Sequence, residues 1–251
     1  MHSSVKWFWL VVVISWLVTG CEPKPQTTIP MPTSEVIILQ YTPGMQAMPL
    51  MFHQCSLQED SNFAIVTQEK PTARLDPEQA DLIFRLGAPE DLQDFSVIEL
   101  GKEEMVFILN PANPISSLRI EQIRAIFTTQ VTHWNEVDPN YPNDAEIQVW
   151  AFPLGEDLQL ASSQILGGEP VAPSTFLAPD PSAMHQAIAE SPSAIGILPM
   201  RWLDNQVKQL GYDTAPDVET SFPILMISEN PPDGKTKSFA LCLQDLLNKK
   251  E

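Results

Sequence analysis

The side chains that could carry out chemistry are scattered along this chain. Its histidines are isolated, and no His or Cys cluster has the spacing of a metal site. There is neither a Gly-x-Ser-x-Gly turn nor a glycine-rich phosphate loop that ends in lysine. Two adjacent carboxylate pairs, Glu103-Glu104 and Glu156-Asp157, are most simply explained as solvated charge. The sequence therefore predicts no enzyme, no metal site and no cofactor.

The three cysteines fall into two groups. Cys21 ends an N-terminal apolar run, whereas Cys55 and Cys242 lie in the body of the chain. Without metal-type spacing, this second pair could form a disulfide in an oxidising compartment or remain two buried thiols. We expect two buried free thiols, with the disulfide as the alternative.

The N-terminus has the features of an export signal. Lys6 precedes an apolar run at residues 7–18 that is too short to span a bilayer comfortably. Residues 18–21, Val-Thr-Gly-Cys, resemble the lipobox of bacterial lipoproteins, in which the cysteine is acylated and becomes the mature N-terminus. A plain signal peptide or a short membrane anchor is the alternative. We expect a signal peptide at residues 1–20 and a lipid on Cys21 that holds the protein at the extracytoplasmic face of the cell membrane.

Charge and proline content limit the remaining possibilities. Residues 21–34 are polar and proline-rich, which predicts a flexible tether. The formal net charge of −18 disfavours nucleic acid as a partner, because phosphate backbones attract basic surfaces. The 24 prolines in 251 residues exceed the usual share of about 5%, which disfavours long helical bundles.

Beyond residue 34, short apolar runs alternate with segments of helical period, the pattern of an α/β fold. The runs predict strands at residues 36–40, 63–67, 81–86, 105–109, 147–151, 194–198 and 224–228. The periodic segments predict helices at residues 45–57, 119–127, 158–165, 181–190 and 236–247. Ser116 or Ser117 is a candidate N-cap for the second helix.

Residues 106–137 carry the most specific pattern. A strand ends in Asn-Pro-Ala-Asn-Pro at residues 110–114, and a Leu-x-x-x-Gln-Ile-x-x-Ile-Phe helix follows at 118–127 before Trp-Asn-Glu-Val at 134–137. This stretch resembles the middle of phosphate-binding-protein-like solute receptors of ABC importers, which are type 2 periplasmic binding proteins. Prolines stiffen such a crossing, and asparagines suit the turn.

Two later stretches agree with this resemblance. Residues 193–199 are similar to the family's Gly-Ala-Ile-Gly-Tyr strand, and residues 222–228 are similar to its return strand. The resemblance implies a two-lobed α/β fold with mixed sheets flanked by helices and two hinge crossings. Lobe 1 would comprise residues 35–106 and 223–251, and lobe 2 residues 107–222. The solute would lie between the lobes, where closure removes water.

In that family, hydroxyls and backbone N–H groups hold an anion. The loop before the first helix keeps Thr42, Gly44 and Gln46 as candidate donors, although most family hydroxyls are replaced. The alternative is a helix cap with Met45 and Met48 in the core.

Two further family positions differ in how well they are kept. Residues 67–73 lack the glycine that would let a backbone approach phosphate. Asp81 keeps an aspartate at a strand start, which in phosphate receptors can accept a ligand proton. A lone aspartate there is also an ordinary turn residue.

The decisive family position is an arginine followed by Ser-Gly-Thr at the start of a second-lobe helix. Phe152 stands near the arginine position here, and Gly155 precedes Glu156 and Asp157, which stand near the Ser-Gly. An acidic pair is a good helix cap, and it would repel phosphate. The expected ligand-binding residues around this degenerate anion site are Thr42, Gly44, Gln46, Asp81, Phe152 and Gly155.

These features together predict a monomeric, lipid-anchored solute-binding protein that serves an ABC permease and captures a small solute, with an anion among the candidates. The alternative is a degenerate relative that acts as an envelope interaction or sensory protein. That alternative predicts a site filled by the protein's own side chains, such as Phe152 or Met45. Arg85, Arg201 and Lys70 could compensate for the missing arginine, but the sequence does not place them.

Overall fold

The computed structural model describes residues 35–249, except 59, 62, 88–91, 93 and 214–217. Cys21, the predicted signal peptide and the predicted tether lie outside the described residues. Within the described ranges, no helix has the length and apolar character needed to cross a membrane.

The strands and helices alternate along the chain. The strands are β1 (Val36–Tyr41), β2 (Ala64–Glu69), β3 (Leu82–Leu86), β4 (Ser96–Leu109), β5 (Ser117–Arg119), β6 (Gln148–Ala151), β7 (Phe176–Leu177), β8 (Ala194–Pro199), β9 (Lys208–Gln209), β10 (Gly211–Asp213) and β11 (Ser221–Ser228). The helices are α2 (Pro49–Ser56), α3 (Ile120–Phe127), α4 (Trp134–Val137), α5 (Asp157–Ile165), α6 (Pro181–Glu190) and α7 (Gly234–Asn248), with 3-10 turns η1 (Pro43–Met45), η2 (Thr72–Arg74) and η3 (Met200–Trp202).

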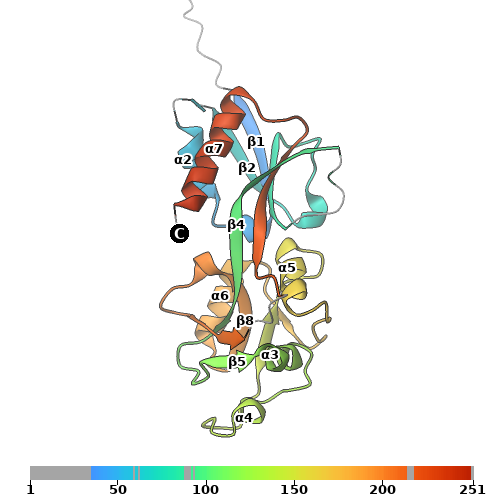
Figure 1. The fold of residues 1–251 in the computed structure, drawn as a ribbon, viewed down its shortest axis with the longest axis vertical. Helices are drawn as coiled ribbons and strands as arrows, with labels where there is room; N and C mark the ends of the chain where they lie inside the picture. Colours follow the sequence, from blue (N-terminus) through green and yellow to red (C-terminus); the bar gives the residue numbers. More distant parts are fainter. Residues whose placement is uncertain are drawn as a thin grey trace, which may run out of the picture. The chain divides into compact units, whose positions relative to one another are not determined.

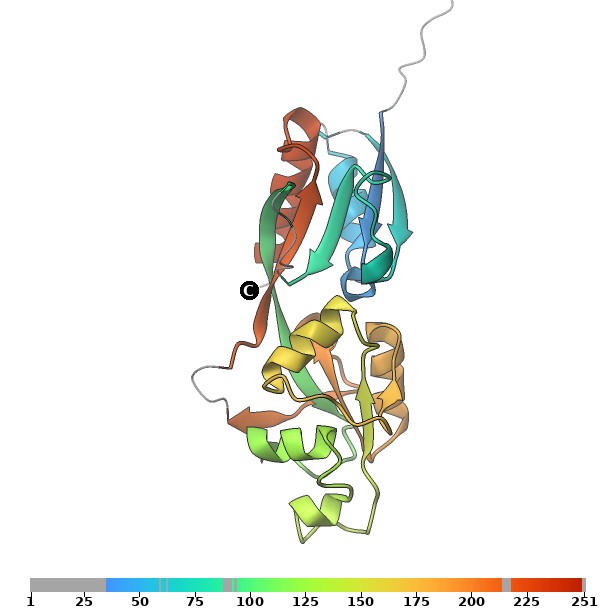
Figure 2. The same ribbon diagram turned by 90° about the vertical axis from the view of Figure 1, so that its right-hand side faces the viewer.

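The sheet confirms the mixed, two-lobed α/β fold. Its order is β2-β1-β3-β11-β4-β8-β6-β7, and β9 pairs with β4. We call β1, β2 and β3 with α2 and α7 the first lobe, and β6, β7 and β8 with α3, α5 and α6 the second lobe. Strands β4 and β11 run antiparallel, side by side, between the lobes (Figures 1 and 2). The lobe boundaries predicted at 106/107 and 222/223 fall inside these two strands.

Every strand and helix predicted from the sequence is present; α6 has the predicted bounds and the others have shifted ends. The helix predicted from residue 45 begins at Pro49, because η1 and a turn come first. The predicted cap at Ser116 or Ser117 is wrong: Ser117 belongs to β5, which pairs with β10, and Arg119 is the N-cap of α3. The buried face of α3 is as expected, with Ile123, Ile126 and Phe127 in the core.

The core of the first lobe explains how its cysteines meet. Helices α2 and α7 lie together on one face of the sheet, and Phe52 of α2 packs against Phe84 of β3 with ring centroids 4.4 Å apart. Cys55 and Cys242 form a disulfide between these two helices. The expectation of two free thiols is therefore wrong. The fold joins cysteines 187 residues apart, and their spacing in the sequence carries no sign of that.

The Asn-Pro-Ala-Asn-Pro crossing is held by its asparagines. Asn110 donates to the carbonyl oxygens of Ile188 and Ala189 at 3.1 and 2.6 Å, and Asn113 donates to that of Pro192 at 2.9 Å. Their own side-chain oxygens accept backbone N–H groups two residues ahead, as an Asx turn requires. The motif therefore fixes the end of β4 against the end of α6.

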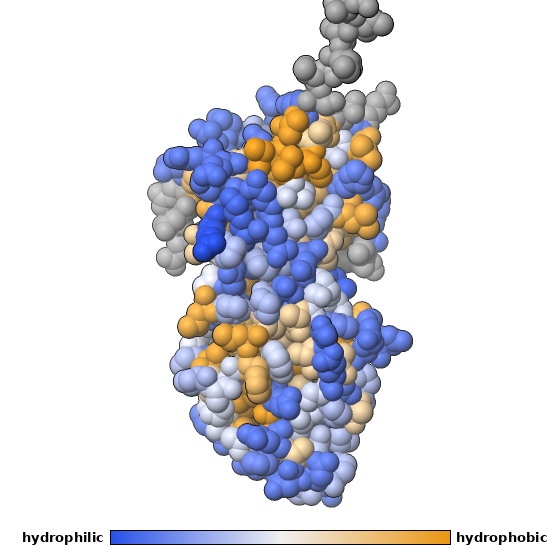
Figure 3. All heavy atoms as spheres, turned by 180° about the vertical axis from the view of Figure 1, so that it is seen from behind, coloured by the Kyte–Doolittle hydropathy of each residue, from blue (hydrophilic) through white to orange (hydrophobic). Residues whose placement is uncertain are grey.

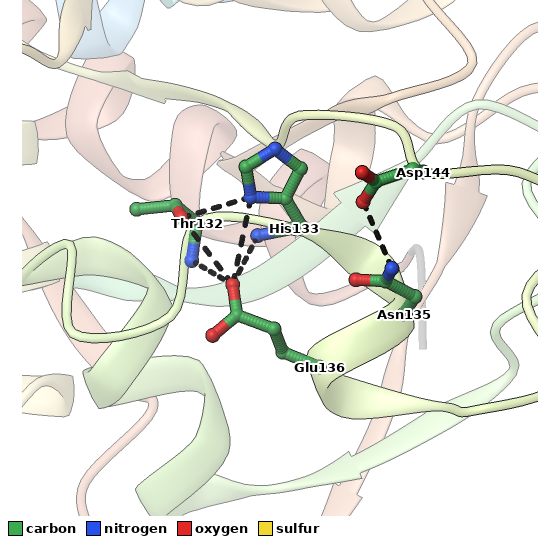
Figure 4. A network of polar contacts seen from close by, with 5 residues as sticks. All are labelled: Thr132, His133, Asn135, Glu136 and Asp144. Atoms are coloured by element: carbon green, nitrogen blue, oxygen red, sulfur yellow. Dashed lines mark hydrogen bonds and ion pairs between the residues drawn. The ribbon is translucent and has the colours of Figure 1, made fainter.

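The Trp-Asn-Glu-Val segment forms the short helix α4, which makes polar contacts with neighbouring residues (Figure 4). Its Trp134 Nε1 also donates to the more distant carbonyl oxygen of Ser193 at 3.1 Å. Glu136 accepts the N–H groups of Thr132 and His133 at 3.0 and 2.8 Å, while Asn135 donates to Asp144 at 2.8 Å. Trp134 is fully buried. These contacts stabilise this part of the second lobe.

Candidate functional site

Three loops of the first lobe meet at one edge of its sheet. Strands β1, β2 and β3 are parallel, so their carboxyl ends share that edge, which is where open α/β sheets bind ligands. Thr42 follows β1, Thr72 follows β2, and Leu86 ends β3. Helix α5 of the second lobe begins against this edge (Figures 1 and 2). We call the contact between these three loops and the start of α5 the lobe junction.

Asp157, the first residue of α5, is the centre of the lobe junction. Its side chain crosses from the second lobe and is 2% exposed. The Thr42 hydroxyl and the Leu86 N–H both donate to Asp157 Oδ2, the latter at 2.9 Å, and the Leu158 N–H donates to Oδ1 at 2.8 Å. The carboxylate is thus bound by a hydroxyl and backbone amides of the kind that bind a free oxyanion.

The neighbouring Glu156 makes a second link between the lobes. Its Oε2 accepts both the N–H and the hydroxyl of Thr72, each at 3.0 Å. The Thr72 hydroxyl oxygen in turn accepts the N–H of Asp157 at 3.2 Å. One hydroxyl therefore serves as donor and acceptor, and it ties two consecutive residues of the second lobe to the first.

Gly44 provides the space that Asp157 occupies. A Cβ atom at this position would lie 2.9 Å from Asp157 Oδ1 and 3.1 Å from Leu158 Cγ, which is closer than packing allows. Thr42 supports the same arrangement, since its hydroxyl caps no helical N–H and is directed to Asp157. Glycine at residue 44 lets the two lobes approach each other closely.

Burial shifts the pKa values of the two ionisable groups Asp157 and Arg85 at the lobe junction. Burial raises the pKa of Asp157, and the hydrogen bonds from Thr42 and Leu86 and the charge of Arg85 oppose that rise only in part. Burial lowers the pKa of Arg85, against the nearby charges of Asp157 and Glu156. Arg85 Nε is buried without a hydrogen-bond partner, so Arg85 acts on Asp157 through its charge.

Arg201 of η3 has a different role from that considered in the sequence analysis. It forms an ion pair with Glu103 of β4, and its Nη1 lies 3.9 Å from the sulfur of Met48. Glu103 is buried, which corrects the interpretation of the Glu103-Glu104 pair as solvated charge. The guanidinium of Arg201 therefore neutralises a buried carboxylate of β4, one of the two strands that connect the lobes.

The predicted site residues separate into two groups. The structure brings Thr42 and Gly44 to Asp157, and Met45 lies in the core close by. Gln46 follows them at the end of η1 with its side-chain oxygen buried and unpartnered. Phe152 is buried in the hydrophobic core of the protein.

Gly155 and Asp81 lie outside the contacts made by Asp157. Gly155 is exposed at φ 86° and donates to Gln159. Asp81 directly precedes β3, at the end of the strand opposite Leu86, where it accepts the Ile38 N–H at 2.7 Å. Asp81 also lines a cavity of about 700 Å³ with Glu35, Glu229 and Asp233.

The acidic pair at the start of α5 was interpreted from the sequence as a cap and as solvated charge, and this is wrong for Asp157. Glu156 occupies the N-cap position but makes no side-chain cap hydrogen bond. Both carboxylates reach across to the first lobe instead. Asp157, Thr72 and Leu86 are the residues that the sequence reasoning did not assign to the site. The sequence did contain one sign of their role: an acidic pair stands at the family's anion-binding position while the candidate donors Thr42 and Gly44 are kept.

A family model described as a PBP superfamily domain matches residues 61–238. The chain belongs to the PBP superfamily. This PBP-superfamily chain is similar to a putative phosphate ABC transporter substrate-binding protein with bound phosphate from Clostridium perfringens. Identity is 17%, coverage is 86% of this chain and 98% of that one, and the TM-score is 0.74.

The chain is also similar in fold to a second transport receptor and to a regulatory domain. An ABC-type phosphate transport receptor from Vibrio cholerae has 19% identity, coverage of 85% and 96%, and a TM-score of 0.64. The regulatory domain of CcmR from Synechocystis, in complex with 2-PG, has 13% identity, coverage of 85% and 98%, and a TM-score of 0.61. At these identities the likeness establishes the phosphate-binding-protein-like fold, and the function has to be argued from the site.

Proposed function

We propose that this chain is an extracytoplasmic solute-binding protein that is anchored by a lipid on Cys21 and serves an ABC-type importer. The observation that supports this role is the donor set of the first lobe. The Thr42 hydroxyl and the Leu86 N–H converge on an oxyanion, the carboxylate of Asp157, at the edge of the sheet where this fold binds ligands. A small solute with an anionic group matches these donors. Free inorganic phosphate does not, because Glu156 and Asp157 stand in its place.

Two features support the proposed location outside the cytoplasm: the lipobox-like segment and the disulfide. The lipobox-like residues 18–21 motivate the anchor. The disulfide between Cys55 and Cys242 is the chemistry of an oxidising compartment outside the cytoplasm. A tether of about a dozen residues would keep the protein within reach of a membrane partner and raise its effective concentration there.

The proposed permease partner would contact both lobes. A partner that touches only one lobe could not distinguish a protein closed around its solute from an open one. Hydrophobic areas are exposed on each lobe (Figure 3). On the first lobe they include Leu50 and Leu57, and on the second lobe Leu154, Phe176 and Leu177.

A thermal-shift screen of the mature protein against small organic acids, amino acids and oxyanions tests solute capture. We expect a saturable rise of the melting temperature with one class of anionic solute and none with inorganic phosphate. If no solute in the screen stabilises the protein, the receptor role is refuted. Replacement of Cys21 by Ala tests the anchor separately, because the protein should then leave the membrane fraction.

A second candidate function is that of a non-transport relative with an interaction or sensory role in the envelope. The observation that favours it is the occupant of the site, which is the protein's own side chain: Asp157 is buried and hydrogen-bonded on both oxygens. This candidate predicts that wild-type protein binds no solute, whereas a receptor must let a solute displace Asp157. The same screen therefore separates the two functions.

A further inference from the structure

The occupant of the lobe junction has the chemistry of a ligand. A buried carboxylate needs hydrogen-bond donors, and Asp157 obtains its donors from the other lobe as well as from its own helix. Thr42 and Leu86 lie 115 and 71 residues away in the sequence. These donors belong to a preformed edge of the first lobe and reach a group that another part of the chain delivers.

Two further observations show that the position is built for this group. Gly44 leaves no room for a Cβ beside Asp157 Oδ1, so the backbone of η1 closely surrounds the carboxylate. Arg85 adds a positive charge nearby without a hydrogen bond to it. A helix cap would require neither the close approach nor the contacts with the other lobe.

We infer that Asp157 is an internal ligand: its carboxylate occupies an oxyanion site of the first lobe and competes with free anions for it. Without this side chain, the Thr42 hydroxyl and the Leu86 N–H would be free to donate hydrogen bonds to a free monocarboxylate. Replacement of Asp by Gly removes one carbon and one carboxylate group, which are the heavy atoms of acetate. Acetate is therefore the expected probe for the uncovered site. This inference does not depend on the importer role.

The test is acetate binding to the full mature chain carrying Asp157→Gly. Its melting temperature should rise by about 3–6 °C at an acetate concentration tenfold above Kd, relative to sodium chloride of equal ionic strength. Wild-type protein should not respond, since Asp157 fills the site. Asp204→Gly is the matched control, because it removes a hydrogen-bonded carboxylate of the second lobe that lies on the surface. It should not respond to acetate either.

A second substitution links the binding to the proposed donor. Thr42→Val in the Asp157→Gly background keeps the size of residue 42 but removes its hydroxyl, so acetate binding measured by calorimetry should weaken at least tenfold. The inference is overturned if folded Asp157→Gly protein binds no acetate. It is equally overturned if the double variant binds acetate as well as the single one, or if the wild type binds it too.

If Asp157→Gly does not fold, as judged by circular dichroism, a double-mutant cycle replaces the binding test. Thr42→Val and Asp157→Asn, alone and together, are compared by urea unfolding. A coupling above about threefold in the unfolding constant supports the internal ligand, and a smaller coupling overturns it. Failure of either test leaves solute capture by the wild type to be decided by its own screen.

Discussion

The two ends of strands β1 and β3 hold aspartates by backbone N–H groups, and the surroundings of these aspartates differ. At the lobe junction, Asp157 is buried and accepts hydrogen bonds from both lobes. At the opposite end, Asp81 is exposed and accepts one N–H from Ile38. Both carboxylates are held by the first lobe, but only Asp157 belongs to the other lobe.

The comparison shows why one aspartate can behave as a ligand and the other cannot. Water solvates Asp81, so its hydrogen bond replaces one to water and its net contribution is small. Asp157 has lost its water, and its removal leaves buried donors unpaired. The candidate site is therefore the position where a side-chain substitution should have a large effect.

The largest effect is expected when each aspartate is replaced by Ala. Asp157→Ala should lower the free energy of unfolding by about 2–4 kcal/mol, because it leaves the Thr42 hydroxyl and the Leu86 N–H buried without partners. Asp81→Ala is the matched control and should cost less than about 1 kcal/mol. Urea unfolding measures both values, and equal losses would break the comparison.

The next effect tests the close approach at the lobe junction. Gly44→Ala places a Cβ 2.9 Å from Asp157 Oδ1 and should cost about 1–3 kcal/mol through overpacking. If the clash is with Asp157, then Asp157→Gly should relieve most of it in the double variant. An undiminished cost there would place the clash elsewhere, for example at Leu158.

A smaller effect isolates one hydrogen bond. Thr42→Val removes the hydroxyl at nearly constant size and should cost about 1–3 kcal/mol, in the lower part of the range if Asp157 becomes protonated. Thr42→Ser keeps the donor and should recover part of that loss. A serine variant as unstable as the valine variant, in the same unfolding assay, would mean that the methyl group and not the hydroxyl matters.

The sequence predicted most of the fold because its signals are local. Residues 110–114 and Trp134 contact distant residues such as Ile188 and Ser193, but they belong to contiguous motifs that the sequence itself displays. Strands β5, β7, β9 and β10 have only two or three residues and therefore no periodicity to detect. The part of β4 before Met105 is too polar to predict as a strand, since its buried Glu103 depends on Arg201, 98 residues later.

The candidate site was harder to predict for the same physical reason. Thr42 and Gly44 could be predicted because their loop matches the donor loop of the resembled family, although most of its hydroxyls are replaced. The role of Asp157 depends on donors that only the folded lobes bring to it. Its burial is invisible in a sequence where Glu156-Asp157 precedes a helix, as capping residues do. The disulfide partners Cys55 and Cys242 are even farther apart in the sequence, at 187 residues.

The smallest effect concerns an exposed carboxylate and has the opposite pKa direction to that of Asp157. The hydrogen bond from His185, together with that from the Gln206 N–H, lowers the pKa of Asp204 from 3.8 to about 2. A lowered pKa in the folded state means that the contribution to stability is present above pH 3.8 and is lost as the pH falls towards 2. Asp204→Asn should therefore be slightly less stable than the wild type above pH 3.8, and this difference should disappear as the pH falls towards 2. Urea unfolding of wild type and variant at several pH values between 2 and 6 measures this difference. A difference between wild type and variant that does not shrink as the pH falls from 4 to 2 would contradict it, and would show that an exposed pair contributes through packing instead of charge.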